Sequence, residues 1–295
     1  MKRECPLKRK GPWYLCLIGE GVQRLPLSLA LLLGSFLGLL TYYLWRPRTG
    51  IALDNLHRVW EGKKSEVELR QIARRMYQNF GKGFVEFLRL PLLTPQNLHD
   101  CVSIEGMEHL EAARARGRGV FVLSAHFGNW EMLSAVIALS GIPMNVLAKK
   151  IRNVPIDWFI NSIRRGSGVN PIDKQNGGEN ILGRLRNNEA VGFVLDQHAN
   201  ATEGVTVRFF GQEASTYKSL ALLARRYKVP IVPVFIIRER LGFHRMVLEP
   251  ALELCKGKNV NDSILEDTQQ CMNVLERFIR NYPDQWIWLH RRWKK

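Results

Sequence analysis

The stretch Val122-Leu123-Ser124-Ala125-His126-Phe127-Gly128-Asn129-Trp130-Glu131 places a histidine between a strand and a helix. Residues 119–124 are apolar and β-rich, as in a buried strand, and residues 129–140 have a helical pattern. In open α/β sheets, ligands bind at the carboxyl ends of the strands. The pattern therefore predicts an α/β fold in which His126 lies where chemistry takes place.

The alternation of strands and helices continues through the second half of the chain. Strands that alternate with helices predict a mixed, largely parallel sheet with helices on its faces. The other expected strands are 143–148, 190–195, 230–237 and 244–250, and the expected helices are 154–166, 178–187, 215–228 and 262–281.

Residues 25–45 form an uncharged run that is rich in leucine. A bilayer core about 30 Å thick needs roughly 20 apolar residues in a helix, so the run predicts a membrane anchor. A cleaved signal peptide would have a shorter apolar run and a small-residue cleavage site after it. We therefore expect the helix to be retained.

The orientation of this anchor stays open at the level of sequence. Cations flank both ends in similar numbers, so the positive-inside rule gives no decision. Pro26, Gly34 and Gly38 allow a bent or shallow helix whose two flanks both lie on the cytoplasmic face. A full crossing is not required by the sequence.

A capping box at Ser65-Glu66-Val67-Glu68 opens the next predicted helix. Apolar residues recur behind it at three- and four-residue spacing, which is typical of an amphipathic helix. They are Leu69, Ile72, Met76, Phe80 and Phe84. The predicted organisation is a basic segment at 1–24, a membrane helix at 25–45, a basic helical neck at 46–100 and an α/β domain at 101–295.

The composition favours a folded protein with an anionic partner. The chain of 295 residues carries 43 Lys and Arg against 27 Asp and Glu, which gives a net charge of +16, yet 46% of it is hydrophobic. This excludes a disordered chain and a transporter with many membrane spans. Five scattered cysteines without a CxxC pair suggest neither a disulfide framework nor a zinc site, and we expect no metal.

The last ten residues, 286–295, combine three tryptophans with basic residues. This composition suits the lipid headgroup boundary. The alternative is a basic tail whose tryptophans pack in the protein core.

His126 and Glu131 are the first candidates for catalysis. A carboxylate five residues on, across a turn at Gly128, can fold back onto the imidazole and leave its other nitrogen as a general base. On spacing alone, a structural pair is the more common interpretation.

The wider pattern resembles the lysophospholipid acyltransferase superfamily, and within it the late acyltransferases of lipid A biosynthesis. The His126–Glu131 block is similar to that family's His-x4-Asp/Glu motif. The likeness extends over nearly the whole chain, through Asp196-Gln197-His198, the run 209–216, Val232-Pro233-Val234 and Trp288-Leu289-His290-Arg291-Arg292.

This resemblance implies a glycerol-3-phosphate acyltransferase-like fold and an acyltransferase activity. The fatty acyl chain would pass from a thioester, usually on acyl carrier protein, to a hydroxyl of a lipid A precursor or related glycolipid. His126 would take the hydroxyl proton and Glu131 would orient His126. Transfer would be direct, without a cofactor or a covalent acyl-enzyme, at an anionic membrane. The implied location is the cytoplasmic face of the bacterial inner membrane.

Five further residues complete the candidate site, and each has an alternative interpretation. Arg164 would contact the oxyanion or a phosphate, or it complements its helix dipole. Asp196 would position the acceptor sugar or hold Arg164, or it only forms a turn. Thr216 would touch a phosphate at a helix start, or it only caps that helix. Phe127 and Trp130 would line the acyl channel, or they are core residues.

Other functions remain as alternatives. The acceptor could be a phosphatidylinositol mannoside, an ornithine lipid or a lysophospholipid, and the donor could be acyl-CoA. A more remote hypothesis is a non-catalytic lipid-binding scaffold. No nucleic-acid partner is expected, because the sequence holds no recognised nucleic-acid-binding motif.

Overall fold

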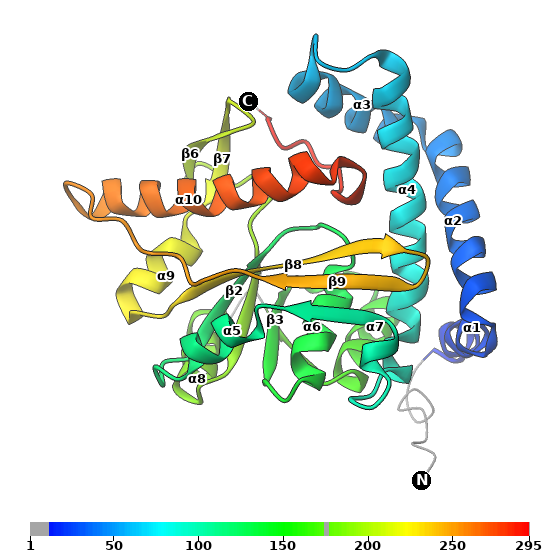
Figure 1. Cartoon of the computed structure of the whole chain (residues 1–295), viewed down its shortest axis with the longest axis horizontal. Coiled ribbons are helices and arrows are strands. Elements are labelled where there is room, and N and C mark those ends of the chain that lie inside the picture. The colour runs from blue at the N-terminus through cyan, green and yellow to red at the C-terminus, as the bar shows by residue number, and fades with distance from the viewer. Residues whose placement is uncertain (1–11, 174–176, 295) are drawn as a thin grey trace.

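A mixed seven-stranded sheet forms the centre of the computed structural model, which describes residues 12–173 and 177–294 (Figure 1). The strand order is β1-β9-β8-β2-β5-β3-β4, and every neighbouring pair is parallel except β8 with β9. The predicted fold class is therefore confirmed. The strands are β1 (Val102–Glu105), β2 (Val120–Ser124), β3 (Met144–Ala148), β4 (Val169–Asp173), β5 (Ala190–Val194), β8 (Ile231–Arg240) and β9 (Phe243–Leu248).

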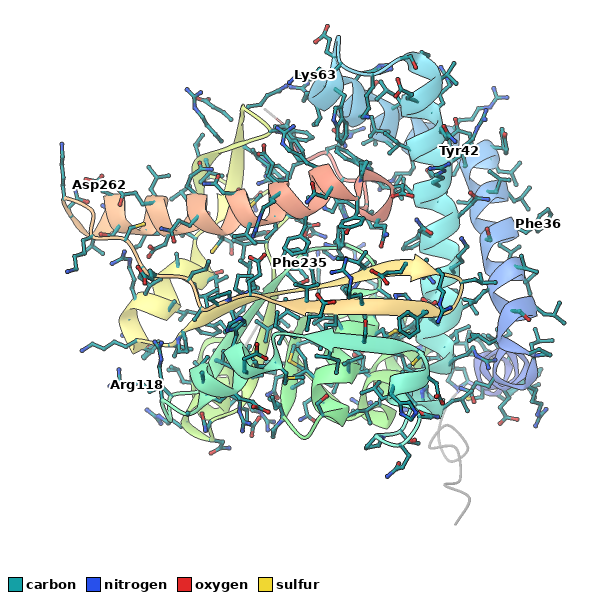
Figure 2. The ribbon with its side chains drawn as sticks, viewed as in Figure 1. Phe36, Tyr42, Lys63, Arg118, Phe235 and Asp262 are labelled. Atoms are coloured by element: carbon teal, nitrogen blue, oxygen red, sulfur yellow. The ribbon has the colours of Figure 1, made fainter. Side chains whose placement is uncertain are left out.

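Helices cover both faces of this sheet because its central strands are apolar on both sides. On β2, Phe121 and Leu123 belong to a core shared with the last helix, whereas Val122 belongs to the core on the opposite face. Phe235 of β8 stacks on Phe278 at 4.0 Å between the sheet and that helix (Figure 2). The helices of this region are α5 (Met107–Arg114), α6 (Trp130–Leu139), α7 (Val154–Gly166), α8 (Gly177–Arg186), α9 (Ser219–Tyr227) and α10 (Val260–Asn281).

The strands β6 (Gly204–Phe209) and β7 (Gln212–Tyr217) form a separate two-stranded hairpin. One sequence prediction is wrong in this region. Residues 215–217 were expected to begin a helix, but they pair with residues 204–206, and α9 begins only at Ser219. The polar run Glu-Ala-Ser-Thr has no strong local strand pattern, and its pairing partner supplies the strand geometry. The short strands β1 and β4 were also missed, since their exposed polar residues hide the alternation.

The amino-terminal third consists of α1 (Trp13–Arg24), α2 (Leu27–Leu44), α3 (Arg46–Trp60) and α4 (Glu66–Arg89). The predicted capping box is present, because Ser65 Oγ accepts from the Glu68 N–H at 3.4 Å and Glu68 accepts from the Ser65 N–H at 2.7 Å. Leu69 and Met76 of α4 are buried as expected. Both α3 and α4 contribute to the same core as α10.

The predicted membrane anchor corresponds to α2. Among the described residues, this is the one helix that is long and apolar enough to cross a membrane, judged by length and composition. Figure 1 shows α2 running beside α4. A Cβ atom on Gly38 would lie 2.1 Å from the Tyr77 carbonyl oxygen, so the two backbones meet where only glycine fits. The basic residues at positions 2–10 lie outside the described residues.

The closing tryptophans do not occupy a membrane boundary, and that expectation is wrong. Trp286 and Trp288 are 1% and 0% exposed and pack in the core against Phe210 and Trp60. Trp293 stacks on Phe209 with ring centroids 5.8 Å apart. Their indole rings fill space between α3, the β6–β7 hairpin and the sheet.

Candidate active site

The turn after β2 presents His126, as the strand-then-helix pattern predicts. Gly128 has a positive φ of 55°, and a Cβ atom there would lie 1.9 Å from the Ile236 carbonyl oxygen. Glycine is therefore required for the tight turn. Asn129 then caps α6, with its side-chain oxygen accepting from the Met132 N–H at 3.1 Å. The histidine thus stands between a rigid strand and a capped helix.

Asp196 is the carboxylate that holds His126. Its Oδ1 lies 2.8 Å from Nδ1 of the imidazole, and its Oδ2 accepts from the backbone N–H of His126 at 2.9 Å. Trp286 Nε1 donates to the same Oδ2 at 2.8 Å. Asp196 follows β5, which is the parallel neighbour of β2, so the carboxyl ends of two adjacent strands bring the pair together.

Burial and the ion pair have opposite effects on the pKa values of His126 and Asp196. Burial alone lowers the pKa of His126, but the Asp196 carboxylate, with a smaller contribution from Glu131, raises it above its ordinary value. For Asp196, burial opposes ionisation, yet His126 and the Trp286 N–H hold its pKa far below the usual range. A proton therefore favours the imidazole rather than the carboxylate.

The outer edge of the imidazole remains accessible. The His126 side chain is 19% exposed, and no hydrogen bond engages its Nε2 within residues 12–173 and 177–294. Trp130 lies edge-on to the ring at 5.1 Å, and His290 lies at 5.4 Å. Burial is the main cause that lowers the pKa of His290. With Nδ1 turned toward Asp196, Nε2 can accept a proton from a group that enters the site.

Glu131 does not orient His126, which corrects the role inferred from the motif. It lies in the first turn of α6 and pairs with Arg164 of α7, at 2.9 Å from Nε and 2.5 Å from Nη2. The capped start of α6 turns this side chain toward α7, and Asp196 occupies the imidazole nitrogen instead. The expectation that Asp196 holds Arg164 is wrong for the same reason.

Thr216 does not lie at a helix start, so the expected phosphate contact there is also wrong. It belongs to β7, is fully buried and hydrogen-bonds to the Arg292 guanidinium. Phe127 is equally buried, among Phe235, Phe278 and Tyr282, and is a core residue rather than a channel residue.

The carboxyl-terminal segment is part of the site, although its composition predicts a place at the lipid boundary or in the core. The Ile287 N–H donates to the His126 carbonyl at 3.0 Å, and the Gly128 N–H donates to the Gln285 carbonyl at 2.8 Å. Residues 285–287 thereby run alongside the histidine turn. The available signal was the family likeness at 288–292, which directly follows these residues in the sequence.

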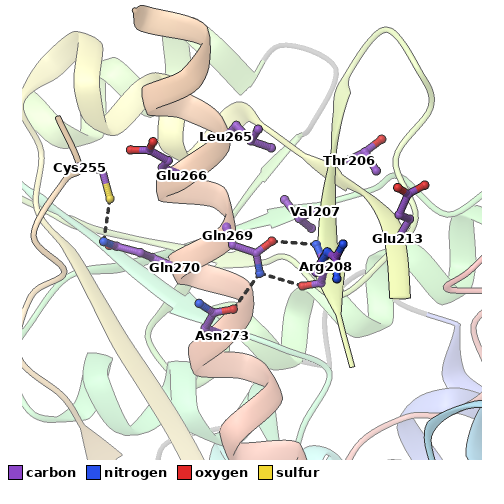
Figure 3. A pocket seen from close by; sticks show the side chains of 10 residues that line it. All are labelled: Thr206, Val207, Arg208, Glu213, Cys255, Leu265, Glu266, Gln269, Gln270 and Asn273. Carbon is purple, nitrogen blue, oxygen red and sulfur yellow. Dashed lines mark hydrogen bonds between the residues drawn. The ribbon is translucent and has the colours of Figure 1, made fainter. Parts of the chain in front are cut away.

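A hollow on the described surface lies away from this site. It encloses about 530 Å³ between the β6–β7 hairpin and α10. Figure 3 shows Gln269 bridging the Arg208 backbone and Gln270 bonded to Cys255 beside it. No residue of the His126 site lines this hollow, so we do not assign the chemistry to it. Within the described residues, no cluster of three His, Cys, Asp or Glu side chains can hold a metal ion.

Comparison of the chain with known proteins identifies its family. The model of the bacterial lipid A biosynthesis acyltransferase family matches residues 4–295. A lipid A biosynthesis palmitoleoyltransferase from Escherichia coli K12 is 25% identical over 288 residues, which cover 96% of this chain and 92% of that protein. A lipid A biosynthesis lauroyltransferase from the same organism is 26% identical over 291 residues, with the same coverage.

A relative whose name gives a different acceptor is also similar. A phosphatidylinositol mannoside acyltransferase from Mycobacterium tuberculosis CDC 1551 is 25% identical over 222 residues, which cover 73% of this chain and 68% of that protein.

The fold and the site together define an α/β protein with a carboxylate-held histidine at the carboxyl end of its sheet. The family match extends over that whole arrangement and the helices before it. The chain belongs to the bacterial lipid A biosynthesis acyltransferase family, and it is an acyltransferase.

Proposed function

We propose that this protein moves a fatty acyl chain from an acyl thioester to a hydroxyl of a lipid A precursor, with His126 as general base. The observation that carries the proposal is the contact of His126 Nδ1 with buried Asp196, at 2.8 Å. It leaves Nε2 as the proton acceptor at the end of β2. The family match and the two relatives from Escherichia coli support lipid A as the acceptor class.

In this mechanism, Nε2 of His126 removes the proton from the acceptor hydroxyl, and the hydroxyl oxygen attacks the carbonyl carbon of the thioester. The tetrahedral intermediate then collapses, the carbon–sulfur bond breaks and the imidazolium returns its proton to the departing thiolate. Asp196 stabilises the imidazolium between these two steps. The transfer is direct, so the reaction needs no serine or cysteine nucleophile.

Arg164 is the group we propose to bind negative charge in the substrate. Its guanidinium carries five N–H donors. Glu131 and Asn161 accept three hydrogen bonds from it, at 2.9, 2.5 and 3.2 Å. Its other two donors have no partner among residues 12–173 and 177–294, and we propose that they bind an oxyanion or a phosphate oxygen. Glu131 acts here as the residue that positions Arg164.

Acyl carrier protein is our proposed donor, and the cytoplasmic face of the bacterial inner membrane is the proposed location. The net charge of +16 favours an acidic carrier protein, a phosphorylated glycolipid and an anionic membrane. Raised ionic strength should therefore increase KM for the carrier-protein donor. A KM that is indifferent to salt would contradict electrostatic capture of the carrier.

The second candidate function is acyl transfer to another glycolipid, which the Mycobacterium tuberculosis relative favours. Mass spectrometry of lipid A from cells with and without the protein separates the two. Loss of one acyl mass without the protein, restored by the native chain and not by His126→Ala, supports the main proposal. Unchanged lipid A together with an altered second glycolipid would support the alternative.

A further inference from the structure

We propose that α2 lies in the plane of one membrane leaflet instead of crossing the bilayer, so that both its ends remain on the side of the catalytic sheet. The proposal concerns how the chain binds a membrane, and it stands on observations separate from the chemistry at His126.

The outward face of α2 is apolar along its whole length. Large side chains recur there at three- and four-residue spacing and are 41–61% exposed, and Figure 2 shows Phe36 pointing away from the protein. These residues are Leu29, Leu32, Phe36, Leu40 and Tyr43. The buried residues Ala30, Leu31, Gly34, Gly38 and Tyr42 lie on the other face. A helix with one buried and one exposed apolar face rests against protein on one side and faces a further apolar phase on the other.

The inner face of α2 is fixed to α4 over most of its length. A Cβ atom on Gly34 would lie 2.7 Å from the Gly81 carbonyl oxygen, and a Cβ atom on Gly81 would lie 2.0 Å from the Gly34 carbonyl oxygen. Such close backbone contact through small residues is typical of tightly paired helices in membrane proteins. The pairing prevents α2 from standing away from α4.

In turn, α4 is fixed to the catalytic sheet. Glu86 is buried and pairs with Arg238 of β8 at 2.5 Å and with His244 of β9 at 3.0 Å. Asn79 donates to the Asp284 carbonyl at 3.1 Å. If α2 crossed the bilayer, these polar groups beside it would be drawn to the depth of the hydrocarbon, which is costly.

Both ends of α2 are also tied to the same body. Before α2, Arg89 donates to the carbonyls of Val22, Gln23 and Leu25 at 2.6, 3.1 and 2.9 Å. After α2, Arg48 donates to the Leu289 carbonyl at 3.1 Å. A helix of 18 residues is about 27 Å long, close to the thickness of a bilayer core. A crossing would place these two attachments on opposite membrane faces, which one rigid body does not allow.

Neighbouring helices extend the apolar face and supply its charged border. Trp13 of α1 is 72% exposed, and Phe80 and Phe84 of α4 are 43% and 54% exposed. Arg24 lies at one end of α2 with a side chain that is 77% exposed. At the other end, Arg74 lies over the Tyr43 ring at 5.9 Å. Aromatic rings and cations around an apolar face are the chemistry of an anionic lipid surface, so the occupant we propose is one leaflet with anionic headgroups.

The test is to find which membrane side each end of α2 faces. An azide-bearing phenylalanine replaces Arg24 in one variant and Lys63 in another, and the full chain is reconstituted in sealed vesicles of phosphatidylglycerol and phosphatidylethanolamine. A membrane-impermeant alkyne dye is then added outside. In-plane binding predicts that the labelled fraction at position 24 equals the labelled fraction at position 63. This equality should hold both in sealed vesicles and after the vesicles are opened with detergent. Complementary fractions, one position protected where the other is accessible, would overturn the proposal.

A depth measurement checks the same point independently. A fluorophore at Leu29, Phe36 or Tyr43 is quenched by lipids that carry spin labels at graded depths. In-plane binding predicts similar shallow depths at all three positions, about 5–10 Å below the headgroups. A crossing predicts that position 36 lies about 10 Å deeper than the other two, from the 1.5 Å rise per residue.

A fluorophore at Val260 is the matched control. This apolar residue is 70% exposed and begins α10, at the far end of the molecule from α2 in Figure 1. It should show no quenching by lipid. If cross-linking instead shows that a second copy covers Phe36 and no lipid quenching occurs there, the lipid surface is excluded. Each variant is first checked for acyl transfer, which separates loss of fold from a change in depth.

Discussion

Nδ1 of His126 and Oδ1 of Asp196 lie 2.8 Å apart although 70 positions separate the two residues in the chain. The contact exists because β2 and β5 are parallel neighbours whose carboxyl ends coincide. It assigns to Asp196 the role that sequence spacing suggested for Glu131.

Replacement of Asp196 should reduce the rate and move its pH dependence. In Asp196→Asn the imidazolium loses its carboxylate, so we expect kcat to fall by about 100-fold or more. Because the carboxylate raises the pKa of His126, its removal lowers that pKa. The acidic limb of kcat/KM should then shift to lower pH. Asp100→Asn, on the surface, is the control and should leave the profile unchanged.

Glu131 should behave differently from Asp196. Glu131→Gln frees Arg164 from its carboxylate partner, so we expect a higher KM for the lipid acceptor and a smaller shift of the acidic limb. The measurement is a pH series of kcat and KM beside Asp196→Asn. A shift in Glu131→Gln as large as that in Asp196→Asn would mean that Glu131, and not Asp196, supports the imidazolium.

Trp286 should matter through its N–H group. Trp286→Phe keeps an aromatic ring in the core but removes the donor to Asp196 Oδ2. We expect kcat to fall by about 10-fold, which corresponds to about 1.4 kcal/mol, the size of one hydrogen bond to a charged group. Trp288→Phe is the matched control, because its indole donates to the Pro283 carbonyl instead. Equal kcat values in the two variants would argue against this role.

Glu86 should govern stability in acid. Burial opposes its ionisation, but His244 and Arg238 hold the pKa of Glu86 far below its usual value. Since the folded pKa is depressed, the stabilising effect is complete above the unfolded pKa of about 4.3 and is lost as the pH falls further. Below that pH, the unfolding temperature measured in detergent should therefore change less with pH in Glu86→Gln than in the native protein. At pH 7 this variant should lose about 3–5 kcal/mol, because Arg238 is left buried without its partner. Glu61→Gln, in the exposed turn after α3, is the control.

The contact between α2 and α4 should depend on glycine. Gly38→Val would place side-chain atoms on the Tyr77 carbonyl, so we expect a lower unfolding temperature and faster proteolysis near residue 45. Gly50→Val, in α3, has no atom within 4 Å of its added Cβ and serves as the control for valine in a helix. Equal destabilisation by both would show that helix propensity, and not close packing, causes the loss.

The sequence predicted those parts of the structure that depend on local pattern. The buried strand before His126, the capping box at Ser65 and the uncharged run 25–45 each specify an element without help from distant residues. The partner of His126 could not be obtained in this way. Asp196 and Trp286 reach the histidine through sheet topology and through the return of the carboxyl terminus, and neither leaves a periodic signal.

The same limit explains the assignment of the closing tryptophans. A segment that combines tryptophans with arginines has the composition typical of a membrane boundary, whether its indole rings are buried or exposed. Burial depends on α3 and the β6–β7 hairpin, which lie far away in sequence and provide the space for Trp286 and Trp288. Composition alone cannot distinguish the two environments.

The return of residues 285–287 to the histidine turn has a consequence for the order of synthesis. The apolar helix α2 leaves the ribosome before the strands of the sheet and can meet a membrane while those strands are translated. His126 acquires its supports from Ile287 and Trp286 only after all seven strands of the sheet have been synthesised. If α2 binds a leaflet as proposed, a nascent chain is held at the membrane before it can act, and a chain that stops short of residue 286 is membrane-bound yet inactive.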